Sequence, residues 1–223
     1  MNLNDAVHSF RIPIAIILGY AELLAKGEVP DEATRQAYIE KIYEQGQLLD
    51  VRLSRLSDAA ELSGGRLRIA RTPIDVQKML LSTCGGMEQF IESTGSRIRV
   101  ESGEEPIVAE IDAVQVIKVL HNLTENAVKY MGRPGEIVIT ASKAGRDLLI
   151  VFRDNGRGMP AEDVSHIFEQ EWQGENRVGG SGFGLYHARL VMEAHGGGIF
   201  ARGGEGRGLA IYMRFPNAVQ GRV

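Results

Sequence analysis

The chain has 223 residues, of which 43% are hydrophobic and 24% are charged, the composition of a globular protein with one or two domains. Its 25 basic and 29 acidic side chains give a net charge of −4, which argues against a nucleic-acid-binding function. Apolar runs such as Ile14 to Leu18 are far shorter than the ~20 residues of a membrane span, no signal peptide is recognisable, and the single Cys84 cannot form an internal disulfide. We therefore expect a cytoplasmic segment without direct membrane contact.

Helical periodicity dominates the first quarter of the chain. Apolar side chains recur every three or four positions from Val7 to Leu24 and again from Ile39 to Ala60, the pattern of coiled coils and bundles. The segment KGEVPD at 26–31 separates the two helices, because its glycine suits a helix C-terminus and its Pro-Asp pair suits a new start. One apolar stripe per helix cannot be buried well within a single hairpin, so we expect two copies to form a dimeric four-helix bundle. The alternative is a two-helix arm folded against the rest of the chain.

The remainder of the chain alternates between helical and strand patterns. A linker that leads into an edge strand is expected at 63–72. Beyond it we predict helices at 75–94, 112–131 and 183–195, and strands at 97–102, 137–140, 148–154, 198–202 and 209–215. Strands in hairpins beside packed helices predict an α+β protein whose second part is a two-layer α/β sandwich with a mixed sheet. The expected domains are a helical hairpin at 1–65, a linker at 66–72 and the sandwich at 73–218.

The first of three motifs is HNLTENAVKY at 121–130. Helical spacing places Asn122, Asn126, Lys129 and Tyr130 along one face, opposite the apolar residues of the same helix. An amide oxygen is a suitable ligand for Mg²⁺, which binds together with substrate phosphates, and a lysine one turn later can reach those phosphates. On its own, the pattern is equally that of a solvated polar helix face.

The second motif, DNGRGM at 154–159, follows directly on an apolar strand. Asp154 therefore ends a strand, where its carboxylate can accept a hydrogen bond from an exocyclic amine. Gly156 and Gly158 let the backbone approach a flat ring. A simple strand-ending turn is the alternative, because Asp-Asn-Gly is also favourable turn chemistry.

The third motif, GGSGFGL at 179–185, opens the last predicted helix. Glycines before a helix N-terminus leave backbone N–H groups available to an anion, so this motif predicts a phosphate site. The intervening residues 160–180 contain Phe168 and Trp172 among many polar side chains, and we expect them to form a mobile lid.

In their order and spacing, the three motifs resemble the nucleotide-binding boxes of two-component sensor histidine kinases. The sequence IFE at 167–169 is similar to the phenylalanine box of that family, and HSFRIP at 8–13 is similar to its histidine box. The resemblance extends from residue 4 to residue 216. The ATP-binding half also resembles gyrase, mismatch-repair and heat-shock chaperone ATPases, whereas the histidine box is specific to the kinases.

This resemblance implies an ATP-dependent protein-histidine kinase that phosphorylates itself and passes the phosphoryl group to an aspartate on a response-regulator receiver domain. His8 would be the phosphoacceptor; it follows Val7 of the apolar seam and is expected to face solvent, with Pro13 bending the helix. Asn126 would hold Mg²⁺, with Asn122 nearby. The implied nucleotide contacts are Asn122, Asn126, Lys129, Tyr130, Asp154, Gly156, Gly158, Met159, Arg177, Gly180, Ser181, Gly182, Phe183, Gly184 and Leu185.

The chain departs from the family pattern at five positions that bear on the chemistry. Ser9 stands where an acidic residue usually follows the histidine, and Ile12 stands where Thr or Asn is linked to dephosphorylation of the partner. Gln170 and Gln173 replace cations that meet the γ-phosphate. Leu209 replaces a Thr or Ser that commonly helps to bind adenine.

These departures leave open a nucleotide-binding pseudokinase that scaffolds a signalling complex. In favour of a kinase, Arg177 can replace the missing lid cation, and water can replace the missing base. An ATPase that drives a conformational change is disfavoured, because such enzymes need a carboxylate base where this chain has Asn122. The first helix is also expected to extend upstream of His8, which predicts a longer parent protein with a sensor domain.

Overall fold

The computed structural model describes the backbone of residues 3–27, 29–63, 67–103, 105–169, 172 and 184–219, and the side chains of the same residues except 3–9, 47, 48 and 50–63. The chain divides into two compact units, Met1–Gly65 and Arg66–Val223. None of the helices in these described stretches is long and apolar enough to cross a lipid bilayer.

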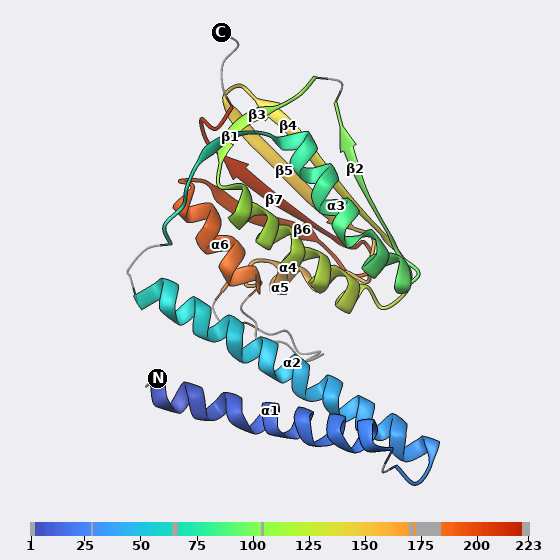
Figure 1. The fold of residues 1–223 in the computed structure, drawn as a ribbon. Coiled ribbons are helices and arrows are strands. Elements are labelled where there is room, and N and C mark those ends of the chain that lie inside the picture. Colours follow the sequence, from blue (N-terminus) through green and yellow to red (C-terminus); the bar gives the residue numbers. More distant parts are fainter. Residues whose placement is uncertain are drawn as a thin grey trace. The chain divides into compact units, whose positions relative to one another are not determined.

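The first unit is a helical hairpin of α1 (Leu3–Lys26) and α2 (Glu32–Ser63), which run side by side in opposite directions (Figure 1). α1 ends at Lys26 and is followed by Gly27, whose left-handed φ of 69° favours a residue without a side chain. α2 begins after Asp31, whose carboxylate accepts hydrogen bonds from the Thr34 backbone N–H at 2.7 Å and from the Thr34 hydroxyl at 3.0 Å. These caps confirm the predicted break between the two helices.

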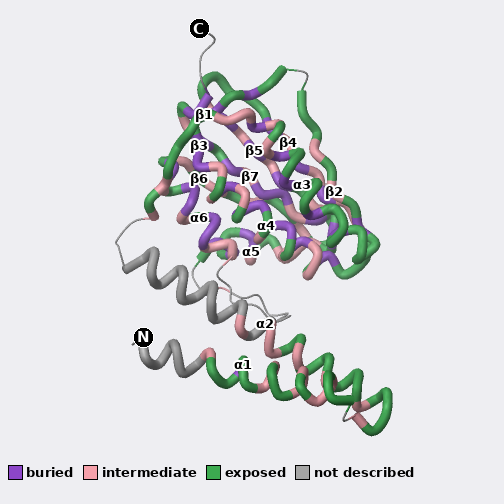
Figure 2. Tube along the Cα trace, viewed as in Figure 1, coloured by how far each residue is buried: buried purple, intermediate pink, exposed green. Residues whose placement is uncertain are grey.

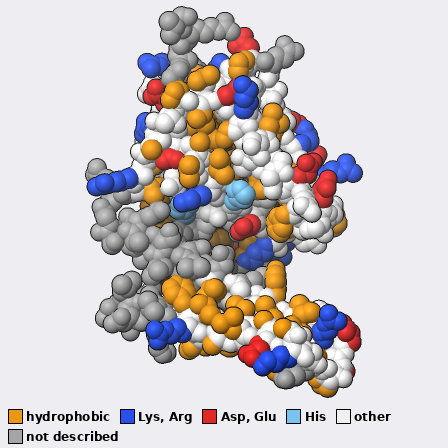
Figure 3. Space-filling model, in the orientation of Figure 1, with side chains coloured by type: hydrophobic (Ala, Val, Ile, Leu, Met, Phe, Trp, Pro, Cys, Tyr) orange, Lys and Arg blue, Asp and Glu red, His pale blue; other side chains and the backbone are white. Residues whose placement is uncertain are grey.

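The hairpin buries little of its apolar surface. Among its residues with described side chains only Pro13 is buried, whereas buried positions run through the second unit (Figure 2). Apolar side chains gather on the visible face of the hairpin (Figure 3). The large apolar residues that it exposes, with between 41% and 67% of each accessible, are Ile12, Ile14, Leu18, Ile39 and Tyr43. One hairpin therefore leaves apolar side chains exposed on both of its helices.

The second unit contains a five-stranded sheet with helices on one face. In chain order its elements are β1 (Thr72–Asp75), α3 (Val76–Ser93), β2 (Arg97–Ser102), β3 (Val108–Ile111), α4 (Ala113–Met131), β4 (Glu136–Ala144), β5 (Asp147–Asp154), α5 (Ala161–Val164), α6 (Gly184–Ala194), β6 (Gly198–Gly203) and β7 (Leu209–Phe215). The strand order is β2-β4-β5-β7-β6, in which β2 and β4 are parallel and the other neighbours are antiparallel. Helices α3, α4 and α6 cover one face of this sheet (Figure 1). The predicted α+β class and mixed sheet are confirmed.

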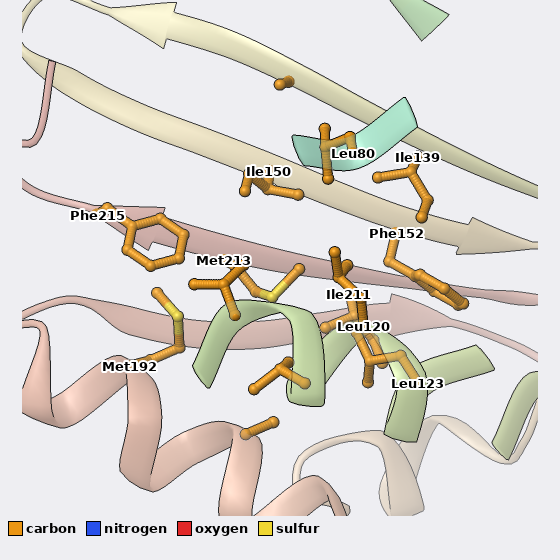
Figure 4. Close-up of a cluster of buried hydrophobic side chains, with 14 of the residues drawn as sticks. Leu80, Leu120, Leu123, Ile139, Ile150, Phe152, Met192, Ile211, Met213 and Phe215 are labelled. Carbon is orange, nitrogen blue, oxygen red and sulfur yellow. The ribbon is translucent and has the colours of Figure 1, made fainter. Parts of the chain in front are cut away.

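The core lies between the sheet and these helices (Figure 4). Every second residue of β5 is buried, with Leu148, Ile150 and Phe152 at most 1% exposed. From the helical layer, Leu120 and Leu123 of α4 are equally buried. Because one side of α4 packs on the sheet, most polar residues of this helix, with the exception of Thr124, lie away from the core, where they can form a site.

The structure differs from the sequence-based expectation in three places. Strand β4 runs to Ala144 instead of ending at 140, because its polar end continues to pair with β5. The edge strand expected after the linker is β1, and it pairs with β3 in a separate two-stranded sheet. β3 and α5 were not predicted, because four residues carry too little periodicity to be recognised.

Candidate functional site

Helix α4 carries the first group of predicted residues. Its N-cap Asp112 accepts a hydrogen bond from the Gln115 backbone N–H at 3.1 Å, and its C-cap Gly132 has a left-handed φ of 73°. The side turned to the core carries Val116, Val119, Leu120, Leu123, Thr124, Ala127 and Met131. Asn122 and Asn126 are half-buried beside this apolar stripe, as the helical spacing predicts.

The N-terminus of α6 lies against both asparagines. A Cβ added at Gly184, the first residue of α6, would lie 3.5 Å from the Asn122 Cβ and 3.7 Å from the Asn126 Nδ2. Two motifs that are far apart in the sequence therefore meet at this point. Backbone N–H groups at a helix N-terminus attract anions, and amide oxygens are ligands for hard cations. The arrangement can hold a phosphate group together with its metal ion.

Asp154 lies at the end of β5, paired with Leu209 of β7. Its Oδ1 accepts a hydrogen bond from the Gly156 N–H at 2.9 Å. Burial raises the pKa of this carboxyl, and the hydrogen bonds from the backbone N–H groups of Gly156 and Leu209 oppose that rise. Gly156 packs on the end of α4, where an added Cβ would lie 2.9 Å from the Met131 Cα. A half-buried acceptor is thus fixed beside α4, where it can recognise an amine.

Three glycines near Asp154 pack backbone to backbone, and we call Gly158, Gly204 and Gly208 the glycine floor. Gly158 has a φ of 66°, and a Cβ added there would overlap the Gly204 carbonyl oxygen. Gly208 has a φ of 71°, and a Cβ added there would overlap the Asp154 carbonyl oxygen. Neither glycine can be replaced without displacing backbone. The loop after β5 is therefore held against the turn between β6 and β7 by main-chain contacts.

Two cations meet at the ring of Tyr130. The Lys129 Nζ lies 5.1 Å from the ring centroid, and the Arg157 guanidinium carbon lies 5.7 Å from it. The Arg157 backbone is fixed, because its carbonyl accepts a hydrogen bond from the Gly206 N–H at 2.6 Å. Lys129 and Tyr130 were predicted from the sequence, whereas Arg157 was not. The available signal was its place between the two glycines of DNGRGM.

The segment after the second motif is attached to the core. Ile167 and Phe168 are 1% and 7% exposed. Met159 and Trp172 are half-buried and pack against the core from its edge. The described part of the expected lid is therefore anchored at the phenylalanine box.

Several predicted residues lie outside the described part of the chain. They are Gln170, Gln173, Arg177, Gly180, Ser181, Gly182 and Phe183, together with the side chains of His8 and Ser9. Leu185 is half-buried and packs against the core, and Ile12 is 55% exposed on α1. Among the residues that the structure describes, no group of three His, Cys, Asp or Glu side chains is placed to hold a metal ion.

Two protein families match this chain. Residues 2–65 match the family described as "His Kinase A (phospho-acceptor) domain", and residues 111–219 match the family described as "Histidine kinase-, DNA gyrase B-, and HSP90-like ATPase". A phospho-acceptor hairpin followed by an ATPase domain of this type defines the sensor histidine kinases. The chain belongs to the two-component sensor histidine kinases.

Individual relatives are similar over nearly the whole chain. The alginate biosynthesis sensor protein KinB of Pseudomonas aeruginosa is 29% identical over 222 residues, which are 95% of this chain and 36% of KinB. The structure of full-length ShkA in complex with AMPPNP has a TM-score of 0.78 at 23% identity, covering 100% of this chain and 47% of ShkA. Histidine kinase ThkA in complex with response regulator TrrA has a TM-score of 0.67 at 21% identity, covering 96% of this chain and 60% of that one. These structures share the fold, and the chain spans 36% of its relative KinB.

Proposed function

We propose that this chain is the catalytic core of an ATP-dependent protein-histidine kinase. It binds Mg-ATP, transfers the γ-phosphoryl group to His8, and passes it to an aspartate on a response-regulator receiver domain. The observation that carries the proposal is the meeting of Asn122 and Asn126 with the N-terminus of α6, in a chain that also has a phospho-acceptor hairpin.

Asp154 is assigned to the adenine end of the nucleotide. The exocyclic amine of the base donates a hydrogen bond to this carboxylate, and partial burial strengthens the bond because the surroundings are less polar than water. The glycine floor holds the loop after β5 by main-chain contacts and so keeps the Asp154 carboxylate in place for the base. Leu209 offers an apolar side chain where a hydroxyl is common in the family, so base recognition relies more heavily on Asp154.

The asparagines and α6 are assigned to the phosphate end. The amide oxygen of Asn126, with Asn122 beside it, would hold Mg²⁺, and the metal supplies neutralisation of the phosphate charge. Lys129 adds a positive charge from the same helix, and the first turn of α6 offers backbone N–H groups. Positioning and charge stabilisation are the main requirements of phosphoryl transfer, and these residues meet both.

The transfer step takes place at His8. One ring nitrogen attacks the γ-phosphorus, the bond from that phosphorus to the β–γ bridging oxygen breaks, and ADP leaves. The proton on the other ring nitrogen passes to water, because Ser9 stands where a carboxylate would accept it. Loss of a general base typically slows a reaction ~10²–10⁴-fold, so we expect slow autophosphorylation. The phosphoryl group then moves from the histidine nitrogen to a carboxylate oxygen of the regulator.

The exposed apolar side chains of the hairpin support a homodimer. Ile12, Leu18 and Tyr43 are 55%, 63% and 67% exposed on α1 and α2. A second hairpin packed on the same faces would bury them in a four-helix bundle. A regulator partner is supported by the likeness to ThkA, which was solved with its response regulator.

Intact-mass analysis after incubation with Mg-ATP tests the proposal on wild type, His8→Ala and His166→Ala. We expect one acid-labile phosphate on wild type and on His166→Ala, and none on His8→Ala. Unchanged phosphorylation of His8→Ala refutes the proposal. If the protein binds nucleotide but neither wild type nor any variant is phosphorylated, the pseudokinase alternative is correct and the kinase proposal is wrong.

A further inference from the structure

Two cations lie at the ring of Tyr130, and only Lys129 is used by the proposed function, which leaves Arg157 without an assigned role. Lys129 and Arg157 lie 5.1 and 5.7 Å from the centroid of one ring. Within the described part of the chain, no carboxylate forms an ion pair with either cation. Two like charges at one ring repel each other, and a bound anion would relieve that repulsion. The pair is therefore suited to a negatively charged ligand.

Arg157 extends from a backbone that is fixed on both sides. Gly156 packs on the Met131 Cα, and Gly158 packs on the Gly204 carbonyl oxygen. The Arg157 carbonyl itself is bonded to Gly206. The cation–π contact of the guanidinium with Tyr130, at 5.7 Å from the ring centroid, restricts the exposed side chain and so lowers the entropy that is lost when a ligand binds.

Arg157 lies close to the proposed base site, at the C-terminal end of α4, where a Cβ added at Gly132 would lie 3.9 Å from the Arg157 Cδ. It follows Asp154 by three residues, a distance of at most about 11 Å along the chain. An arginine side chain that starts this close to Asp154 is long enough to reach a phosphate of a nucleotide whose base Asp154 holds. Lys129 and Tyr130 join Arg157 to the helix that carries Asn126.

We propose that Arg157 contacts the nucleotide: its guanidinium, which lies at the Tyr130 ring together with Lys129, donates hydrogen bonds to a phosphate of bound ATP. This assignment rests on the proposed function. Arg157 supplies, from a fixed loop, a positive charge that the chain lacks at Gln170 and Gln173 of the lid. The planar fork of arginine suits phosphate oxygens.

The test compares affinities for ATP, ADP and adenosine in the presence of Mg²⁺, measured by calorimetry on wild type, Arg157→Ala, Arg157→Lys and Arg153→Ala. Arg153 is the matched control, because it is an exposed arginine of β5 without an ion pair among the described residues. We expect Arg157→Ala to weaken ATP and ADP about tenfold or more, the effect of one charge-assisted hydrogen bond. Adenosine affinity should stay within about twofold, since that ligand has no phosphate to lose a hydrogen bond.

Two further readouts separate contact from a structural role. Arg157→Lys should fall between wild type and Arg157→Ala, because lysine keeps the charge and loses the fork. In a Tyr130→Leu background, Arg157→Ala should have a smaller effect, because the ring that orders the guanidinium is gone.

Three results overturn the assignment. In the first, Arg157→Ala and Arg153→Ala have the same affinity for ATP. In the second, Arg157→Ala weakens adenosine binding as much as ATP binding, which means that Arg157 only shapes the loop. If wild type binds none of the three ligands, the proposed function fails and this assignment fails with it. Wild-type binding combined with a silent Arg157→Ala refutes the assignment alone.

Discussion

His195 joins three parts of the second unit, and its removal gives a sharp stability prediction. The ring is 3% exposed. Its Nε2 accepts a hydrogen bond from the Asp112 N–H at 2.9 Å, and its Nδ1 lies 2.8 Å from the Val191 carbonyl oxygen, so Nδ1 carries the proton of a neutral ring. The ring also meets Phe215 edge to face at 5.2 Å. Asp112 in turn caps α4 and accepts a hydrogen bond from the Ala70 N–H at 2.7 Å.

The loss of folding stability caused by His195→Ala can be worked out from these contacts. The Asp112 N–H would remain buried without an acceptor, which costs about 1–3 kcal/mol. The cavity left by the ring adds about 1–2 kcal/mol. The Val191 carbonyl keeps the helical bond from the His195 N–H at 3.1 Å, so it adds nothing. We expect the free energy of unfolding to fall by about 2–5 kcal/mol in total.

Urea unfolding followed by tryptophan fluorescence measures this loss. Trp172 is the only tryptophan of the chain and packs against the core of the second unit, so its signal reports the unit that contains His195. His166→Ala is the control, because this exposed histidine should change stability by no more than about 0.5 kcal/mol. A loss below about 1 kcal/mol for His195→Ala, or equal losses in both variants, would refute the reasoning.

The same residue predicts a pH dependence. Burial lowers the pKa of His195, and the charge of Arg71 adds to this effect against the opposing influence of Val191 and Asp112. As pH falls below ~6.5, the unfolded imidazole binds a proton that the folded ring does not, so the free energy of unfolding decreases. In His195→Gln, this contribution to the pH dependence of the free energy of unfolding is absent. If the free energy of unfolding depends on pH equally in wild type and in His195→Gln across that range, folding does not lower the pKa of His195 and the reasoning is wrong.

Three more outcomes are expected. Gly208→Ala should abolish ATP binding and lower the free energy of unfolding by at least about 2 kcal/mol, because the added Cβ meets the Asp154 carbonyl. Gly206 has a similar φ of 72° but open space around it, so Gly206→Ala should lower the free energy of unfolding in urea by only about 1 kcal/mol. Asp154→Asn should lower ATP affinity at least about tenfold in calorimetry. The same change should raise the free energy of unfolding slightly, because burial disfavours the charged carboxylate. Normal ATP binding by this variant would exclude Asp154 from base recognition. Burial raises the pKa of Cys84 to about 11, so a thiol reagent should react slowly with the native protein near neutral pH and quickly in urea, and fast native reaction would contradict that burial.

Local sequence patterns predicted the elements but not the way distant ones meet. Helical spacing located α4 and the polar face with Asn122 and Asn126, because a period of 3.6 is a local property. Glycine-rich motifs likewise located the loop after Asp154. The hydrogen bond between Asp112 and His195 joins residues 83 positions apart, and nothing in either local sequence indicates it. Arg157 was missed for the same reason, since its role depends on where folding places Tyr130.

The glycine floor also restricts how the choice of nucleotide can be redesigned. Its surface is bare peptide, and the space above Gly158 and Gly208 is already filled by carbonyl oxygens. The size and polarity of the binding surface therefore cannot be changed in small steps at these glycines, because even an added methyl group displaces backbone. An engineered variant that accepts an enlarged purine analogue would have to be sought at the surrounding side chains, at Asp154, Met159 and Leu209, where shape can be altered without unfolding the loop.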